Sequence, residues 1–264
     1  MSPDSTARTV LSDALLGPEP ERALRRLREQ GRLRQWLPEV EALAALQPAG
    51  EHPHKDLWEH TLQVVVQSPV RRVVRWAALL HDIGKVPTRR FEPSGAVTFR
   101  GHAEQGALLF EAQIAPRLGF NAPARERIAA LVRHHQRVTQ YDDAFSDRAV
   151  RRLARTLGDG FEDLLDLGRA DVTSRFPERR ERALQRIAAL RTRWRALAEK
   201  DAVPPALPAG LGHHLMAHQK LSPGPRVGAL LGRLEAAVRT GLLPRGAAPE
   251  VYLQWLEQHP DPEP

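Results

Sequence analysis

Cysteine is missing from the 264-residue sequence, which excludes disulfides and thiolate metal sites. Any metal ion must therefore be bound by nitrogen and oxygen atoms of histidine and carboxylate side chains. No apolar run approaches the length of a membrane span, and the first residues are not a basic segment followed by an apolar one. We therefore expect a cytoplasmic protein that does not interact with a membrane.

Lysine is also scarce, since only four of the 39 basic residues are lysine. The others are arginines, and they are spread through nearly every predicted helix. The formal net charge of +7 favours phosphate-bearing substrates, because a basic surface attracts phosphate groups. Most of the arginines are nevertheless expected on solvated helix faces, and the charge alone does not predict binding to a long nucleic acid.

Helical periodicity runs through almost the whole chain, and 42% hydrophobic residues are enough for a core. We predict an all-α protein of three parts. Residues 1–49 form an N-terminal helical segment that packs on the core, residues 50–200 form the main domain, and residues 201–264 form a small helical tail after a linker rich in proline and glycine. A short hairpin is predicted around Ser94 and Gly95.

The segment from Val73 to Lys85 is predicted to be an apolar helix with His81 and Asp82 near its end. His81 falls on the same helical stripe as core residues before it, so its side chain points into the core. A lone histidine there is more often a hydrogen-bonded core residue than a ligand. An adjacent carboxylate in an apolar layer is costly, however, unless a metal ion or a counter-charge compensates it. The pair therefore indicates a metal site.

Further candidate ligands lie near helix ends or on core-facing stripes elsewhere in the chain: His60, His102, His134, His135 and Asp171. A helical bundle can bring such positions together in its interior. With the central pair they make seven donors, which are too many for one tetrahedral ion and suit two ions that share a bridging carboxylate. Mixed imidazole and carboxylate ligands favour Mn, Fe, Ni or Co, with Zn or Mg less favoured. Two such ions activate water and bind phosphate oxygens, so the predicted chemistry is hydrolysis of a phosphoester.

The order of these residues resembles the HD-domain superfamily of metal-dependent phosphohydrolases, whose pattern is a His, then His-Asp, further His residues and a distal Asp. The resemblance covers roughly residues 50–175. It implies that one ion is bound by His60, His81, Asp82 and Asp171. It implies that the second is bound by His102, His134 and His135, with Asp82 bridging. It also implies that Lys85, in the run His-Asp-Ile-Gly-Lys, contacts a substrate phosphate, which makes Asp82 and Lys85 the expected catalytic residues.

A closer likeness extends over most of the chain and points to the HD-containing C-terminal half of bacterial tRNA nucleotidyltransferases, the family of CCA-adding enzymes and poly(A) polymerases. It rests on the motifs Trp58-Glu-His-Thr, Gly101-His-Ala-Glu-Gln-Gly, Val132-Arg-His-His and Arg169-Ala-Asp. The nucleotidyltransferase head is absent from this sequence, so CCA addition is not expected. The tail carries Gly212-His-His-Leu in place of the usual Gly-x-Asp-Leu, so tRNA is an alternative partner rather than the expected one.

The predicted function is that of a stand-alone HD phosphohydrolase, in which a metal-bound hydroxide attacks phosphorus. The resemblance points to 2′,3′-cyclic nucleotides, or RNA ends with terminal phosphates, as the favoured substrates. Nucleoside monophosphates and dinucleoside polyphosphates are alternatives within the class. The alternative from another class is a tRNA-binding accessory module of a separate nucleotidyltransferase, in which the metal site is structural.

Several arginines close to the predicted site in sequence are candidate phosphate ligands: Arg89, Arg100, Arg133, Arg137 and Arg175. For each of them singly, a solvated helix face is the competing interpretation. A surface pair at a helix end is the alternative for His134 and His135, and a buried, hydrogen-bonded carboxylate is the alternative for Asp171. We interpret Glu59 as part of a helix cap at Asp56 rather than as a catalytic residue.

Overall fold

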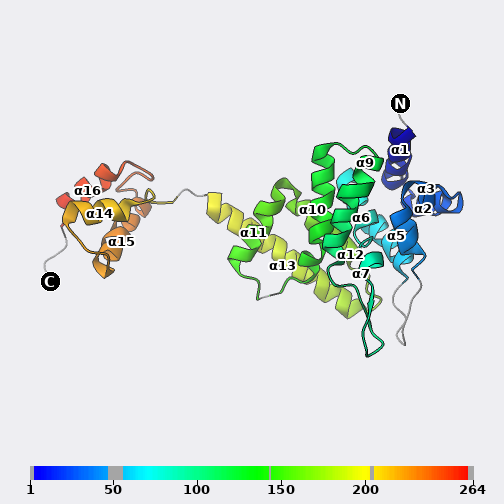
Figure 1. Cartoon of the computed structure of the whole chain (residues 1–264). Coiled ribbons are helices and arrows are strands. Elements are labelled where there is room, and N and C mark those ends of the chain that lie inside the picture. The colour runs from blue at the N-terminus through cyan, green and yellow to red at the C-terminus, as the bar shows by residue number, and fades with distance from the viewer. Residues whose placement is uncertain (1–2, 47–55, 143, 203–204, 261–264) are drawn as a thin grey trace. The chain divides into compact units, whose positions relative to one another are not determined.

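Helices make up nearly all of the regular structure, so the predicted all-α fold is confirmed (Figure 1). The chain divides into two compact units, Met1–Arg195 and Ala196–Pro264. The predicted boundaries at 49/50 and 200/201 stay predictions, and the first of them falls outside the described residues.

None of the described helices combines the length and the apolar character needed to span a bilayer. The computed structural model describes residues 3–46, 56–142, 144–202 and 205–260.

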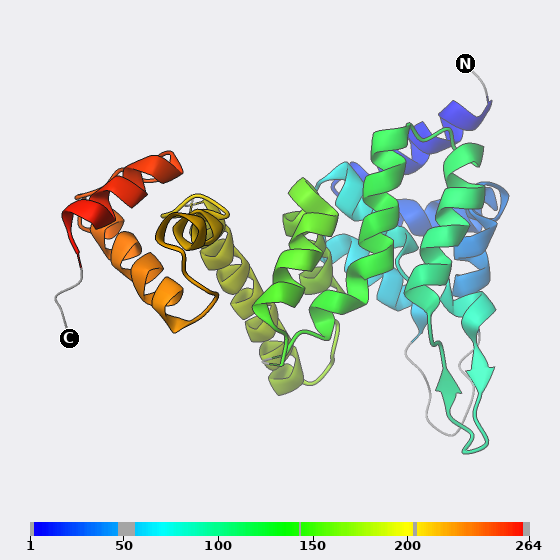
Figure 2. The ribbon, with the colours of Figure 1, turned by 60° about the vertical axis from the view of Figure 1, so that its left-hand side comes forward.

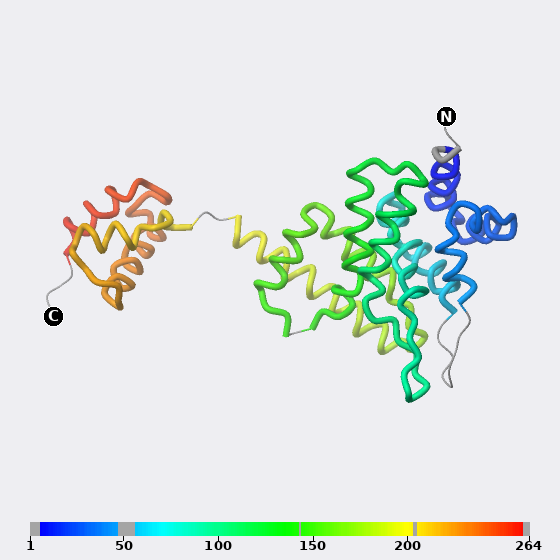
Figure 3. Tube along the Cα trace, in the orientation of Figure 1, coloured from blue at the N-terminus to red at the C-terminus, as the bar shows by residue number. Residues whose placement is uncertain are grey.

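The larger unit begins with a layer of short helices: α1 (Pro3–Leu16), α2 (Pro20–Glu29), α3 (Arg32–Trp36) and α4 (Pro38–Ala44). Prolines open α2 and α4, at a first helical position where no backbone N–H is needed. α1 packs on α6 and α2 packs on α5. The Cα trace shows the layer, in blue, beside the helices that carry the predicted site, in cyan and green (Figure 3).

Four helices form the centre of this unit: α5 (Leu57–Gln67), α6 (Arg72–Leu80), α10 (Ala122–Thr139) and α12 (Phe161–Asp171). α6 contacts the other three, and every residue from Val74 to Leu80 is buried. One of these residues is charged. Arg75 donates hydrogen bonds to the carbonyl groups of Leu15 and Ser68, at the C-terminal ends of α1 and α5, where the helix dipole favours a cation.

Asp56 caps the start of α5, as predicted. One of its carboxylate oxygens accepts hydrogen bonds from the backbone nitrogens of Trp58 and Glu59, at 2.9 and 3.1 Å. The carboxylate of Glu59 has a different partner, because both of its oxygens accept hydrogen bonds from Arg25, at 2.7 and 2.6 Å. Glu59 therefore links α5 to α2 instead of closing a capping box.

The central helix ends earlier than the sequence predicts. α6 stops at Leu80, and the four residues from His81 to Gly84 form a turn before the short helix α7 (Lys85–Thr88). A two-stranded antiparallel hairpin follows, made of β1 (Arg90–Phe91) and β2 (Val97–Thr98). It is the hairpin expected around Ser94 and Gly95, and it projects beyond the neighbouring helices (Figure 2).

The remaining elements of the larger unit join or flank the central helices: α8 (His102–Leu109), a π-helical turn (Phe110–Ile114), α9 (Ala115–Arg117), α11 (Asp147–Leu157), a 3-10 turn (Gly158–Gly160) and α13 (Pro177–Ala202). α8 packs against α10 and α7. The long helix α13 continues past Arg195 into the smaller unit.

The smaller unit contains α14 (Leu211–Gln219), α15 (Pro225–Arg239) and α16 (Pro249–Gln258), so the part of the chain predicted to be a helical tail is helical. Its core includes Leu215, Leu234 and Tyr252. The ring of Tyr252 is completely buried, and its hydroxyl donates a hydrogen bond to the carbonyl of Pro244 at 2.7 Å. Such a partner satisfies the one polar atom of an otherwise apolar side chain.

Candidate metal centre

The turn after α6 carries the central pair of the site. His81 and Asp82 are only 1% and 2% exposed. α8 approaches this turn so closely that a Cβ atom at Gly84 would lie 2.0 Å from the carbonyl oxygen of His102 and 2.5 Å from the backbone nitrogen of Gly106. Only glycine fits at position 84. The close approach sets His102, the first residue of α8, beside Asp82.

Six of the seven predicted ligands converge in two groups of donor atoms. The first group consists of His60, His81 and Asp171, and the second of Asp82, His102 and His135; the donor atoms of each group lie within 4.8 Å of one another. In the first group, Nε2 of His60 lies 3.2 Å from Nε2 of His81 and 3.1 Å from a carboxylate oxygen of Asp171. In the second, the Nε2 atoms of His102 and His135 are 3.3 Å apart. The structure thus gathers side chains from α5, α8, α10, α12 and the turn after α6.

Asp82 lies between the two groups and presents one oxygen to each. Its Oδ2 atom is 3.2 Å from Nε2 of His81 and 3.5 Å from Nε2 of His60. Its Oδ1 atom is 3.3 Å from Nε2 of His102 and 3.9 Å from Nε2 of His135. A carboxylate in this position can bridge two ions.

Each imidazole is held through its other ring nitrogen. In His81, His102 and His135, Nδ1 lies 2.8, 2.9 and 2.7 Å from the backbone carbonyl oxygen of the residue three positions earlier. In His60, Nδ1 lies 2.9 Å from the hydroxyl of Thr173, which itself donates to the carbonyl of Asp171. Hydrogen bonds of this kind fix the orientation of each ring and direct Nε2 at the centre of the site.

Thr173 was not predicted from the sequence. Its only signal there is a hydroxyl side chain two residues after the distal Asp171, which is too weak to single it out. The hydroxyl reaches His60 across 113 positions of the sequence, so only the packing of α12 against α5 reveals the contact.

The donor set fits divalent metal ions. Two neutral imidazoles whose Nε2 lone pairs face each other at 3.2 or 3.3 Å repel, and a proton or a cation bound between them removes the repulsion. Imidazole nitrogen and carboxylate oxygen are the donors that transition metals take in proteins without thiolate ligands. Both groups could therefore hold a metal ion.

The histidines of the site differ in their protonation. Burial, aided by the charge of His81, lowers the pKa of His135 to about 4. Burial also lowers the pKa of His60. For His81, burial is outweighed by the carboxylate of Asp82, so its pKa is raised. At neutral pH the imidazoles of His60 and His135 are therefore uncharged, whereas the carboxylate of Asp82 favours the protonated form of His81.

Both aspartates of the site are ionised. Burial would raise the pKa of Asp82, but the charges and hydrogen bonds of His81, His102 and Lys85 hold it well below its ordinary value. Burial of Asp171 is likewise outweighed, chiefly by the hydrogen bond from His60, and its pKa falls to about 2. The two groups therefore offer negative charge to a cation at any pH near neutrality.

Lys85 joins the site through Asp82. Its Nζ atom donates a hydrogen bond to Asp82 Oδ2 at 2.6 Å, and it lies 5.8 Å from the centre of the Phe99 ring. The side chain of Lys85 is 19% exposed, so it keeps a path to solvent that Asp82 lacks. The predicted contact between Lys85 and a substrate phosphate stays a prediction.

His134 joins neither group, which departs from the predicted ligand set. Consecutive residues of a helix point in directions about 100° apart, and of this pair it is His135 that α10 directs at the second group. His134 is half-buried, and burial together with the charges of Arg133 and Arg137 lowers its pKa. The two groups contain six ligands rather than the predicted seven.

The predicted phosphate-binding arginines have different surroundings. Arg133 donates to Glu104 and Glu111, at 3.1 and 2.8 Å, so two carboxylates already occupy its guanidinium. Arg89 stacks on Phe91, 4.9 Å from the ring centre. Arg100 is exposed and precedes His102 by two residues. A phosphate role for these three residues stays a prediction.

Comparison with known proteins bears on these findings. Residues 57–167 match the model of the HD domain family. The chain is 36% identical to the A-adding tRNA nucleotidyltransferase of Deinococcus radiodurans over 264 residues, which cover 96% of this chain and 58% of that protein. It is 35% identical to the CC-adding tRNA nucleotidyltransferase of Thermus thermophilus over 259 residues, 93% of this chain and 55% of that protein.

A shorter match, 35% identical over 146 residues, joins the chain to the multifunctional CCA protein of Azoarcus sp.; it covers 53% of this chain and 34% of that protein. The chain thus spans little more than half the length of the relatives that match it over most of its own length. The matched segment 57–167 includes five of the six converging ligands, and Asp171 follows it by four residues. The chain therefore contains an HD domain and is homologous over most of its length to tRNA nucleotidyltransferases.

Proposed function

We propose that this chain is a metal-dependent phosphoric ester hydrolase that acts on nucleotides or RNA ends. The observation that carries the proposal is the position of Asp82, which turns one oxygen to each of two buried groups of imidazole and carboxylate donors. An HD domain with such groups points to a metal-dependent hydrolase. We expect two divalent ions, with Mn, Fe, Ni or Co favoured over Zn and Mg.

The proposed roles of the residues follow from their contacts. The first group, His60, His81 and Asp171, would hold one ion, and His102 and His135 the other, with Asp82 shared between them. When bound, a pair of such ions lowers the pKa of a water molecule and neutralises phosphate oxygens. The Nδ1 hydrogen bonds keep the imidazoles oriented while this happens.

Lys85 has a second role in this proposal. Its ammonium group now hydrogen-bonds Asp82, and cations bound by that carboxylate would displace it towards the open side of the site. There it could donate a hydrogen bond to a phosphate oxygen of the substrate and stabilise the negative charge that develops during hydrolysis.

The relatives support RNA ends as the substrate class, because two proteins that match over most of this chain have names that describe enzymes acting on tRNA. Within that class we favour 2′,3′-cyclic phosphates. Nucleoside monophosphates and dinucleoside polyphosphates are the alternatives, since a two-ion centre contacts the phosphate rather than the base.

The proposal is tested by measuring metal content and hydrolysis of a panel that contains 2′,3′-cAMP, 3′-AMP, 5′-AMP, diadenosine tetraphosphate and an RNA with a 2′,3′-cyclic end. We expect metal-dependent hydrolysis by the protein and a loss of at least about 1,000-fold in Asp82→Asn. Asp13→Asn is the matched control, because Asp13 is exposed on α1. Equal rates in the protein and in Asp82→Asn would contradict the proposal.

A second candidate function is a tRNA-binding accessory module with a structural metal site. It is favoured by the length of the match, since the chain corresponds to only 58% and 55% of two relatives whose names describe enzymes acting on tRNA. In that case Asp82→Asn would lower the unfolding temperature. The unsubstituted protein and the variant would both hydrolyse the substrates only at the background rate. Salt-dependent binding to intact tRNA would accompany that result.

A further inference from the structure

The segment after the distal ligand leads from the metal centre to a row of arginines. Asp171 ends α12, and Thr173 contacts His60. Two positions further on, Arg175 and Phe176 are exposed, and α13 begins at Pro177. Five residues of extended chain span at most about 18 Å, so Phe176 lies within that distance of Asp171.

The ring of Phe176 is flanked by guanidinium groups. It is 48% exposed, which is unusual for a phenylalanine. The guanidinium carbons of Arg175 and Arg179 lie 5.1 and 4.9 Å from its centre. Cation–π contacts of this kind hold the two guanidinium groups over the ring.

Three arginines continue from this ring along α13. Arg179, Arg182 and Arg186 are spaced i, i+3, i+7 and therefore share one face of the helix, over about 10 Å of its axis. They line a cavity of about 620 Å³ together with Gln185 and Ala189. All three are exposed, and among the described residues none of them has a carboxylate partner.

Arginines further along the same helix are paired. Arg191 binds Glu162 and Asp166. Arg193 binds Asp147, and Arg195 binds Glu162. Carboxylates of α11 and α12 thus neutralise the second part of this stretch of α13. In its first turns Glu178 and Glu181 stand between the arginines, but neither pairs with Arg179, Arg182 or Arg186.

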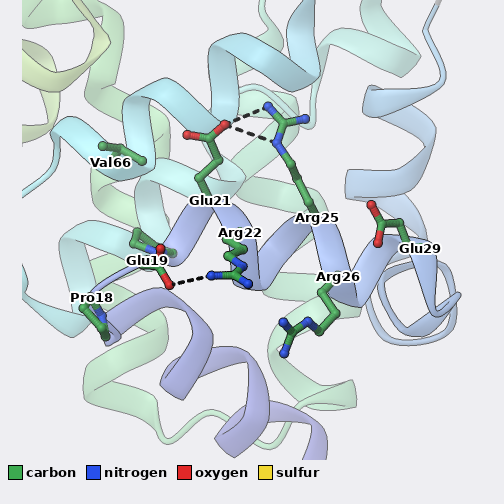
Figure 4. A pocket seen from close by; sticks show the side chains of 9 residues that line it. Pro18, Glu19, Glu21, Arg22, Arg25, Arg26, Glu29 and Val66 are labelled. Carbon is green, nitrogen blue, oxygen red and sulfur yellow. Dashed lines mark hydrogen bonds and ion pairs between the residues drawn. The ribbon is translucent and has the colours of Figure 1, made fainter.

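A second cavity of similar size shows that arginine content alone does not make a cationic site. It measures about 560 Å³ and is lined by residues of α2 and its neighbourhood. There Arg22 pairs with Glu19 and Arg25 pairs with Glu21 (Figure 4), and Arg25 also binds Glu59. Its charges are internally balanced, so it offers little to an anion.

We propose that the first turns of α13 and Phe176 bind a single-stranded RNA, with Arg179, Arg182 and Arg186 on successive phosphates and a base against Phe176. The proposal rests on the proposed function, because it supplies a path for the strand whose end reaches the metal centre. Arginine pairs strongly with phosphate, and exposed aromatic rings with neighbouring guanidinium groups stack on unpaired bases. A base in a duplex does not offer its face in this way.

A lipid surface is the other polyanion that such a row of charges could meet. The small apolar area of this surface argues against it. The cavity lining includes no large apolar side chain, and the ring of Phe176 alone adds little area to insert among acyl chains. Anionic vesicles are therefore one arm of the test.

The test measures affinity for a fluorescent single-stranded RNA oligonucleotide as a function of salt, in chelator so that no hydrolysis occurs. The test variant is Arg179→Gln, Arg182→Gln, Arg186→Gln. The matched control is Arg148→Gln, Arg152→Gln, Arg155→Gln, three exposed arginines at the spacing i, i+4, i+7 on α11. Circular dichroism checks that both proteins keep their helices.

We expect the test variant to lose affinity on the order of 10-fold near 0.1 M salt and to reduce the slope of log affinity against log salt by roughly 2, about 0.7 for each lost phosphate contact. The control should change neither. Phe176→Leu should weaken binding roughly 5-fold or more without changing the slope, because it removes stacking and no charge.

Three outcomes would overturn the proposal: unchanged RNA affinity in the test variant, an equal loss in the control, or tighter binding of the protein to phosphatidylserine vesicles than to RNA. Because the assay involves no hydrolysis, it fails separately from the proposed function. If the protein hydrolyses phosphoesters and the test variant binds RNA normally, only the proposed RNA site on α13 is contradicted. If the protein has no hydrolase activity and the test variant loses affinity for RNA, only the proposed hydrolase function is contradicted.

Discussion

The Nζ atom of Lys85 lies 2.6 Å from Oδ2 of Asp82, the same oxygen that faces His81 and His60. A protein cation thus occupies a place beside the carboxylate that is positioned between the two donor groups. Any metal ion bound there must share Asp82 with this ammonium group or displace it.

Replacement of Lys85 should therefore separate metal binding from turnover. We expect Lys85→Gln to bind Mn²⁺ more tightly, on the order of 10-fold, because a positive charge near the site is removed. Hydrolysis should nevertheless fall, because the substrate phosphate loses a donor. Calorimetric titration and initial rates measure the two effects, with Lys200→Gln as the control. Weaker metal binding in Lys85→Gln would show that the ammonium does not compete with the ions.

The two carboxylates should differ in how many ions they hold. Asp171 contacts only the first group, whereas Asp82 contacts both. We expect Asp171→Asn to keep about one ion per chain and Asp82→Asn to keep fewer than about one, because ion binding requires an ionised ligand. Elemental analysis of the purified proteins gives the answer, with Asp13→Asn as the reference. A full complement of ions in Asp82→Asn would argue against a bridging role.

The hydroxyl of Thr173 should tune metal affinity although it is not a ligand. It lies 2.9 Å from Nδ1 of His60 and fixes that ring. Thr173→Val keeps the shape and removes the hydroxyl, and changes to such supporting contacts typically lower metal affinity about 10- to 100-fold. Thr156→Val on α11 is the matched control. If metal affinity stays the same in Thr173→Val, the ring of His60 is held by its packing alone.

Metal affinity should rise with pH through the titration of His81. The pKa of this imidazole is raised above the ordinary 6.5, so its protonated form persists to higher pH than in an ordinary histidine, and it must lose its proton before it binds a metal. Below that pKa the affinity should increase about tenfold per pH unit, and above it the increase should level off. The pKa of His135, about 4, predicts no contribution from that residue in the same range. Calorimetry in buffers of different ionisation enthalpy measures the released proton, and a constant affinity between about pH 6 and pH 8 would contradict the assignment.

Gly84 should be intolerant of any side chain. A Cβ atom there would overlap backbone atoms of α8, at 2.0 Å from the His102 carbonyl oxygen, and backbone cannot move aside as a flexible side chain can. We expect Gly84→Ala to cost about 3 kcal/mol of unfolding free energy and to lower metal affinity, because α8 carries His102. The control is Gly228→Ala on α15, where the added atom meets nothing within 4 Å and should slightly stabilise the helix. Denaturant unfolding compares the two, and equal stability of both variants would refute the packing argument.

The sequence by itself determined the chemistry of the site and the class of the fold. The lack of cysteine left only imidazole and carboxylate ligands, and helical periodicity placed His81 on a buried face. The same periodicity predicted an all-α chain, and the cap at Asp56 and the turn at Gly95 were visible in residue types alone. These are local properties, because they depend on residues within a few positions of one another.

Only the tertiary structure decided which donors share a group. His60 meets Asp171 across 111 positions because α5 packs on α12, and no spacing in the sequence encodes that contact. The sequence likewise could not show which of the adjacent residues His134 and His135 joins a donor group, because that depends on how α10 is oriented against its neighbours. Periodicity predicts which face of a helix is buried, whereas the packing of one helix against another determines which residues contact that face.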